Sequence, residues 1–153
     1  MKLSNTMKVP KQVEREIAFM LYNYKNIDKL IDERKNNLID NVEVTNRAYL
    51  NSIHAIHSNT LEDVVERFDT DYNITRLKAW KKLLNSFLSK LYDEEDKLYY
   101  YFIKFKYVED MNEERMQERL NITSGQLVEI NMYLKWVIYQ YAIRAELYES
   151  EVA

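Results

Sequence analysis

The spacing of apolar positions along the chain predicts helices from end to end. Between residues 10 and 40, apolar side chains recur at steps of four and three, the spacing of a coiled-coil seam: Val13, Ile17, Met20, Tyr24, Ile27, Ile31 and Leu38. Pro10 suits the first helical turn, because its missing N–H would have no partner there. We therefore expect one long helix over residues 10–40, with Arg34 interrupting the seam. The spacing fits a partner helix within the chain or a dimerisation arm equally well.

The apolar pattern weakens over residues 41–59, where we expect a connection with a short helix near residues 48–57. A second apolar stripe then predicts a helix over residues 61–92. Thr60 and Asp63 resemble a capping box at its start, with aspartate in the place of glutamate or glutamine. The stretch "FDTDYNIT" predicts a break or kink, because its Asp, Asn and Thr side chains compete for backbone hydrogen bonds.

The last third of the chain predicts three further helices. Asp93 is placed to cap the first of them, which holds three successive tyrosines, 99–101. Successive helical residues differ by about 100°, so at least one of these rings should be exposed. A short helix over 112–120 is followed by Asn121 at a tight turn and by Thr123 as N-cap of a helix over 124–149.

Composition supports an all-α fold. The chain has one glycine, Gly125, and one proline, whereas strand-rich folds need many of both at their turns. It contains no cysteine, which is consistent with a reducing cytoplasm. No run of about eighteen apolar residues predicts a membrane span.

The last segment resembles a known DNA-reading motif. Residues 107–135, which include "NEERMQERLNITSGQLVEINMYLK", are similar to the promoter-reading helix-turn-helix of sigma-factor region 4. Its expected core positions carry apolar side chains: Met116, Leu120, Ile122, Leu127, Ile130 and Leu134. Gln117 stands where the motif has a small residue, which would widen the helix crossing or leave the glutamine at a rim.

The preceding stretch, "LEDVVERFDTDYNITRLKAWKKLLNSFLSKLYDEEDKLYYYFIKFKYVE", resembles the helical part of small late-gene transcription regulators from phages of Gram-positive bacteria, the ArpU and RinA type. These regulators pair an N-terminal helical region with a C-terminal sigma-like module and switch on late or packaging genes. The resemblance implies a long N-terminal helical hairpin or arm over residues 1–92. It implies a sigma-region-4-like helix-turn-helix over residues 93–153.

The resemblance also implies which side chains would bind DNA. Those of the reading module are Thr123, Ser124, Gln126, Glu129 and Lys135. Lys78, Lys81 and Lys82 share a face by three-and-four spacing and are candidates for holding phosphates, or else form a solvated face. However, residues 107–153 carry four Lys/Arg against nine Asp/Glu, a net charge of −5, which is unfavourable for DNA.

The last helix has a second apolar side, nearly opposite its core side. Its members include Val128, Met132, Trp136 and Tyr139. A helix with two apolar sides must bury both or expose one. The second side is covered by the N-terminal arm, exposed as a surface for a dimer mate or another protein, or in contact with thymine methyl groups of DNA.

No constellation of residues predicts an enzyme, a cofactor or a metal site. His54 and His57 are the only histidines, and zinc would need at least one further ligand without any cysteine to supply it. Two functional hypotheses remain. In the first, the chain is a DNA-binding, homo-oligomeric transcription regulator of the phage type. In the second, a degenerate helix-turn-helix binds a protein such as polymerase, a repressor or a copy of itself.

Overall fold

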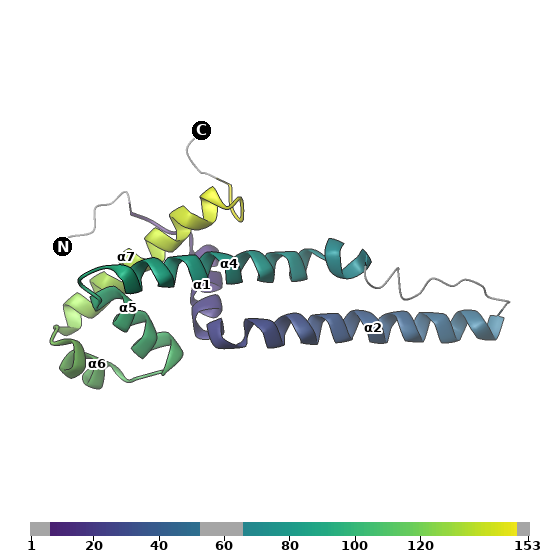
Figure 1. Cartoon of the computed structure of the whole chain (residues 1–153), viewed down its shortest axis with the longest axis horizontal. Coiled ribbons are helices and arrows are strands. Elements are labelled where there is room, and N and C mark those ends of the chain that lie inside the picture. Colours follow the sequence, from purple (N-terminus) through teal and green to yellow (C-terminus); the bar gives the residue numbers. More distant parts are fainter. Residues whose placement is uncertain (1–6, 53–65, 150–153) are drawn as a thin grey trace. The chain divides into compact units, whose positions relative to one another are not determined.

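The computed structural model describes residues 7–52 and 66–149, and these form helices and turns without any strand. The elements in chain order are α1 (Lys11–Tyr22), a 3-10 turn (Tyr24–Asn26), α2 (Ile27–Ser52), α4 (Tyr72–Asp93), α5 (Leu98–Ile103), a π-helical turn η2 (Lys104–Val108), α6 (Glu113–Leu120) and α7 (Ser124–Arg144) (Figure 1). The predicted all-α class is confirmed.

The prediction of a single helix over residues 10–40 is wrong, because α1 ends at Tyr22. Asn23 ends it: both its backbone N–H and its side-chain amide donate to the carbonyl of Phe19, at 3.0 and 2.8 Å. A side chain that takes the backbone's own acceptor favours a helix end over helix continuation. The connection predicted from residue 41 is also wrong as far as the structure describes it, because α2 runs on to Ser52.

The chain divides into two compact units, one made of residues up to 25 with those from 79 onward, the other of residues 26–78. The first unit has its core between α1, the second part of α4, η2 and α7. Its buried side chains include Ile17, Leu21, Trp80, Leu84, Phe87, Phe102, Ile103, Tyr107, Met116, Leu127, Leu134, Ile138 and Ala142. Trp80 lies in this core with its indole N–H donated to Glu16 at 3.0 Å, so its polar atom is satisfied.

Asp93 does not cap the next helix, contrary to the sequence-based expectation. It is the last residue of α4, and α5 begins only at Leu98. Asp96 accepts the backbone N–H of Leu98 at 3.0 Å instead, because it is the carboxylate that lies within reach of the first turn. The prediction of an exposed ring among the three tyrosines is confirmed at Tyr101.

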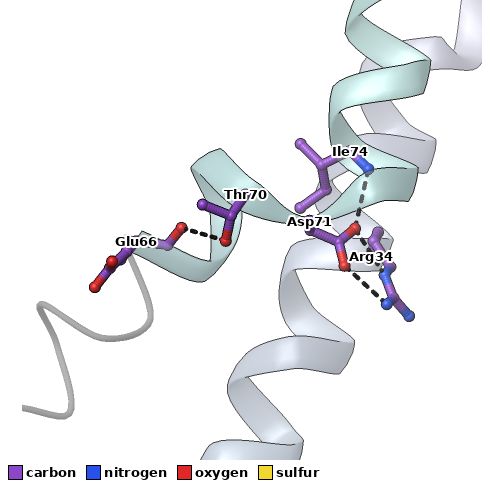
Figure 2. A network of polar contacts seen from close by, with 5 residues as sticks. All are labelled: Arg34, Glu66, Thr70, Asp71 and Ile74. Carbon is purple, nitrogen blue, oxygen red and sulfur yellow. Dashed lines mark hydrogen bonds and ion pairs between the residues drawn. The ribbon is translucent and has the colours of Figure 1, made fainter.

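In the second unit, an ion pair joins α2 to the residue before α4 and also caps α4 (Figure 2). Arg34 on α2 donates two hydrogen bonds to Asp71, at 2.9 and 3.2 Å, and Asp71 accepts the backbone N–H of Ile74 at 3.0 Å. The predicted break in "FDTDYNIT" is confirmed, since helix stops at Thr70 and α4 starts at Tyr72. The hydrogen bonds from Arg34 hold the pKa of Asp71 below its usual value. The predicted capping box at residues 60 and 63 lies outside the described residues.

Substitutions at Asp71 should separate its two roles. Asp71→Ala removes both the ion pair and the cap, and we expect a loss of about 1–2 kcal/mol in the free energy of unfolding. Asp71→Asn keeps an oxygen for the Ile74 N–H but loses the charge, so it should cost about half as much. Urea unfolding followed by far-UV circular dichroism measures both. Equal losses in the two variants would show that the cap contributes nothing.

The same pair gives the sign of the pH dependence. Because the pKa of Asp71 is lower in the folded than in the unfolded chain, its stabilisation is complete above the unfolded value. It is lost as the pH falls through the folded value. The stability difference between the wild type and Asp71→Asn should therefore shrink on acidification.

Candidate functional site

The region from Asn112 to Met132, called here the α6–α7 corner, is built by local side-chain hydrogen bonds. Asn112 caps α6 by accepting the backbone N–H of Arg115 at 2.8 Å. Asn121 then turns the chain in the left-handed conformation, at φ 54° and ψ 52°. Thr123 and Gln126 form a reciprocal capping box at the start of α7, with hydrogen bonds of 3.1 and 2.8 Å. The predicted turn at Asn121 and cap at Thr123 are confirmed.

The inner side of the corner is apolar, as the spacing predicts. Met116 on α6 and Leu127 and Leu134 on α7 are buried, while Leu120, Ile122 and Ile130 are half-buried. Gln117 is half-buried, and its backbone carbonyl accepts the backbone N–H of Ile122 at 3.2 Å. The glutamine that replaces a small residue therefore lies at the edge of this core.

The outer side of the corner leaves the first two turns of α7 uncovered. Ser124, Gly125 and Gln126 are exposed, Val128 is 58% exposed and Met132 is 49% exposed. Glu129 is half-buried. This part of the helix therefore exposes the polar side chains of Ser124 and Gln126 and the apolar side chains of Val128 and Met132.

The second apolar side of α7 is divided between burial and exposure. Val128 and Met132 are exposed, Trp136 is half-buried, and Tyr139 is 5% exposed with its ring edge-on to Tyr148 at 5.9 Å. Tyr139 therefore does not belong to the partner surface expected of it, because the residues after α7 fold back over it. The part of this side at Tyr139 is thus covered by the segment after α7, where the sequence-based alternative expected the N-terminal arm, and the part at Val128 and Met132 is exposed.

α1 packs against the middle of α7, and its contacts there mark the end of the exposed part of α7. Lys135 of α7 donates to Glu14 of α1 at 3.2 Å. Tyr107 of η2 donates to Asn131 of α7 and meets Tyr22 of α1 edge-on, with 4.7 Å between ring centroids. Burial raises the pKa of Tyr107, so its phenol stays a neutral donor at neutral pH.

Two of the lysines predicted to hold phosphates, Lys81 and Lys82, lie away from the exposed start of α7. Lys90 of α4 donates to the hydroxyl of Tyr141 at 2.9 Å, and the ring of Trp80 lies 6.2 Å from that of Tyr148. The α4 segment that carries Lys81 and Lys82 thus runs beside the C-terminal end of α7. Tyr141 is about 25 Å along the helix axis from Ser124.

The individual environments of the α4 lysines also differ. Lys82 is exposed, whereas Lys81 is half-buried and its charge acts on Tyr24. Burial raises the pKa of Tyr24, and Lys81 opposes that rise. Lys78 is exposed and belongs to the second compact unit. Within the first unit, Lys81 and Lys82 therefore lie toward the other end of α7 from Ser124 and Gln126, which their spacing along one helix could not reveal.

Comparison with protein-family models, curated proteins and solved structures finds no match for this chain. Within residues 7–52 and 66–149, no three His, Cys, Asp or Glu side chains converge as metal ligands would. His54 and His57 lie outside that part of the chain. None of the helices in the described residues has the length and apolar character that a membrane crossing requires.

The turn at Asn121 gives a first test of the corner. An alanine at φ 54° carries the full penalty of the left-handed conformation, so Asn121→Ala should lower the free energy of unfolding by about 1 kcal/mol. Asn121→Gly should leave it nearly unchanged, because glycine adopts this conformation freely. Chemical unfolding curves of the two variants provide the measurement. Indistinguishable midpoints would contradict a strained turn.

The single glycine gives a second test. Gly125 does not have a positive φ, and a Cβ there would meet only the Thr123 hydroxyl oxygen, at 3.9 Å. Nothing within the described chain needs a glycine, so Gly125→Ala should raise the free energy of unfolding by about 0.4–1 kcal/mol. Thermal unfolding checks this. A lower melting temperature would mean that this position is constrained by a neighbour.

Proposed function

We propose that this protein is a phage-type transcription regulator that binds DNA as an oligomer through a helix-turn-helix. In this proposal α6 is the positioning helix and α7 the reading helix of a sigma-region-4-like module. The second unit, in which α2 and the start of α4 are joined by Arg34 and Asp71, serves as the helical hairpin or arm. The observation that carries the proposal is the capped and uncovered start of α7.

The exposed side chains at the start of α7 allow a limited base readout. Ser124 and Gln126 are short polar groups of the kind that hydrogen-bond to base edges, although Gln126 also accepts the Thr123 N–H. Val128 suits contact with a thymine methyl group. Glu129 suits a cytosine amino group as an acceptor, but it repels phosphate. Such a surface favours modest affinity for each module.

The proposal includes an oligomer because a single helix-turn-helix of this charge would bind DNA weakly. Residues 107–153 have a net charge of −5 from four basic and nine acidic side chains, so each copy gains little from phosphate neutralisation. Linking two modules makes the second binding event intramolecular and raises the affinity without any new contact. A regulator of this kind would act in the cytoplasm, on DNA of the cell that contains it.

A protein-interaction module is the second candidate, and one observation favours it. Val128 and Met132 form an exposed apolar pair one helical turn apart on a helix that is otherwise well covered. Such a pair suits a protein surface as well as a thymine methyl group. Polymerase, a repressor or a second copy of this chain would then occupy the α6–α7 corner.

The salt dependence of DNA binding separates the two candidates. A labelled duplex of mixed sequence is titrated with the full chain at about 50 mM and about 200 mM salt, and fluorescence anisotropy gives the affinity. A DNA reader should lose roughly tenfold or more over this range, since each released counterion steepens the dependence. Absence of binding even at the lower salt would reject the DNA proposal and favour a protein partner.

A substitution that removes one charge from the reading surface and keeps the side-chain shape sharpens this test. Glu129→Gln removes a negative charge from the start of α7 and should raise DNA affinity roughly threefold or more. Glu149→Gln makes the same change beyond the far end of α7 and should leave the affinity unaltered. Equal behaviour of the two variants would remove the start of α7 from the DNA interface.

A further inference from the structure

We propose that α1 supplies the phosphate-binding residues of the DNA interface, through a basic groove formed by Lys11, Arg15 and Lys135. The ligand is the phosphodiester backbone of duplex DNA beside the groove that α7 enters. This inference rests on the proposed function and deepens it. It assigns phosphate binding to cations of α1 and α7, in place of the α4 lysines that the sequence favours.

The groove lies where α1 packs against α7, within the first compact unit. Its lining consists of Lys11, Glu14, Arg15 and Ala18 from α1 and Lys135 from α7. Three cations and one carboxylate give this lining a net charge of +2, in a chain whose net charge is −3. Lys11 and Arg15 are exposed, one helical turn apart on α1. A local excess of positive charge in a depression concentrates anions.

Along α7, the groove lies on the same side as the exposed residues Ser124 and Val128. At 100° per residue, Ser124, Val128 and Lys135 fall within about 40° of one another around α7. Lys135 lies about 16 Å along the axis from Ser124, closer than the part of the helix that meets α4. A helix whose first turns enter the major groove, about 12 Å wide, brings residues further along that same side against the bordering phosphates.

α1 sets the depth to which α7 could enter DNA. Its contacts with Lys135 and, through Tyr107, with Asn131 cover this side of α7 beyond the first two turns. The surface of α1 would therefore meet the phosphate backbone when Ser124 and Val128 reach the bases. The cations that α1 exposes are Lys11 and Arg15, on either side in sequence of Glu14, the partner of Lys135, and both side chains are long enough to reach phosphate oxygens.

Glu14 lowers the positive charge of the groove and holds Lys135 in place. Its carboxylate pairs with Lys135 at 3.2 Å, and the side chain of Lys135 is only 13% exposed while that of Glu14 is 47% exposed. The pair directs the ammonium group of Lys135 toward α1 and partly cancels its charge. Glu14→Gln would therefore leave Lys135 in place as a hydrogen-bond donor and make the groove more positive.

The test compares two double substitutions with the same charge change and the same spacing. Lys11→Ala with Arg15→Ala should lower the slope of log affinity against log salt by about two, and weaken binding roughly tenfold or more at low salt. The loss should be the same for different DNA sequences, since phosphates carry no sequence information. Lys78→Ala with Lys82→Ala is the matched control on α4 and should change neither quantity.

The outcomes distinguish this inference from the proposed function. If the wild-type chain binds DNA and only the α4 variant loses affinity, the α1 groove is rejected while the DNA proposal stands. If both double variants bind as the wild type does, the α1 groove is likewise rejected. If the wild-type chain does not bind DNA at low salt, the proposed function itself fails. Circular dichroism confirms that both variants keep their helices, which alanine favours.

Glu14→Gln gives an effect of the opposite sign. It should strengthen DNA binding by a few-fold and steepen the salt dependence, because it removes an acid from the lining without adding a cation. Weaker binding of this variant would overturn the assignment of the groove.

Discussion

The first unit is organised by the need to cover a helix that is apolar around most of its circumference. Each side of α7 meets a different neighbour. Tyr133 lies against Tyr99 of α5, Tyr141 against Phe87 of α4, and Tyr139 against Tyr148 of the segment that follows α7. Asn131 and Lys135 are bound by Tyr107 and by Glu14 of α1. Burial of apolar area drives this arrangement, and the polar contacts fix its register.

Because these neighbours gather around the middle and the C-terminal half of α7, the outer side of its first two turns is left uncovered. The capping box of Thr123 and Gln126 satisfies the N-terminal N–H groups that would otherwise need water or a neighbouring element. The start of α7 is therefore stable without cover. Val128 and Met132 are exposed there because no other element of the unit covers them.

Charge limits what the exposed start of α7 could do alone. The last third of the chain is acidic, and the cations nearest in sequence to the start of α7, on α6, are accompanied by glutamates. Our proposals therefore assign base contacts and phosphate contacts to different helices, α7 and α1. The two helices are joined by an ion pair, Glu14 with Lys135, between residues more than a hundred positions apart in the sequence.

Several features of the candidate site could be predicted because they depend on residues within four positions of one another. The cap at Thr123, the left-handed turn at Asn121 and the inward positions of Met116 and Leu127 are of this kind. The break after Thr70 was also predictable, because Asp71 caps α4 from the position just before it. The end of α1 was missed, because an apolar seam continued across Asn23 while its side chain took the Phe19 carbonyl.

The sequence by itself determined that the chain is helical, where the α6–α7 corner turns, and that its C-terminal third is acidic. These properties follow from local hydrogen bonding, apolar spacing and composition. Only the tertiary structure decided which half of the second side of α7 is covered, and which cations line the groove between α1 and α7. These depend on where the segment after α7 and α1 pack, and a helix periodicity shows that a side is apolar without showing which distant element will cover it.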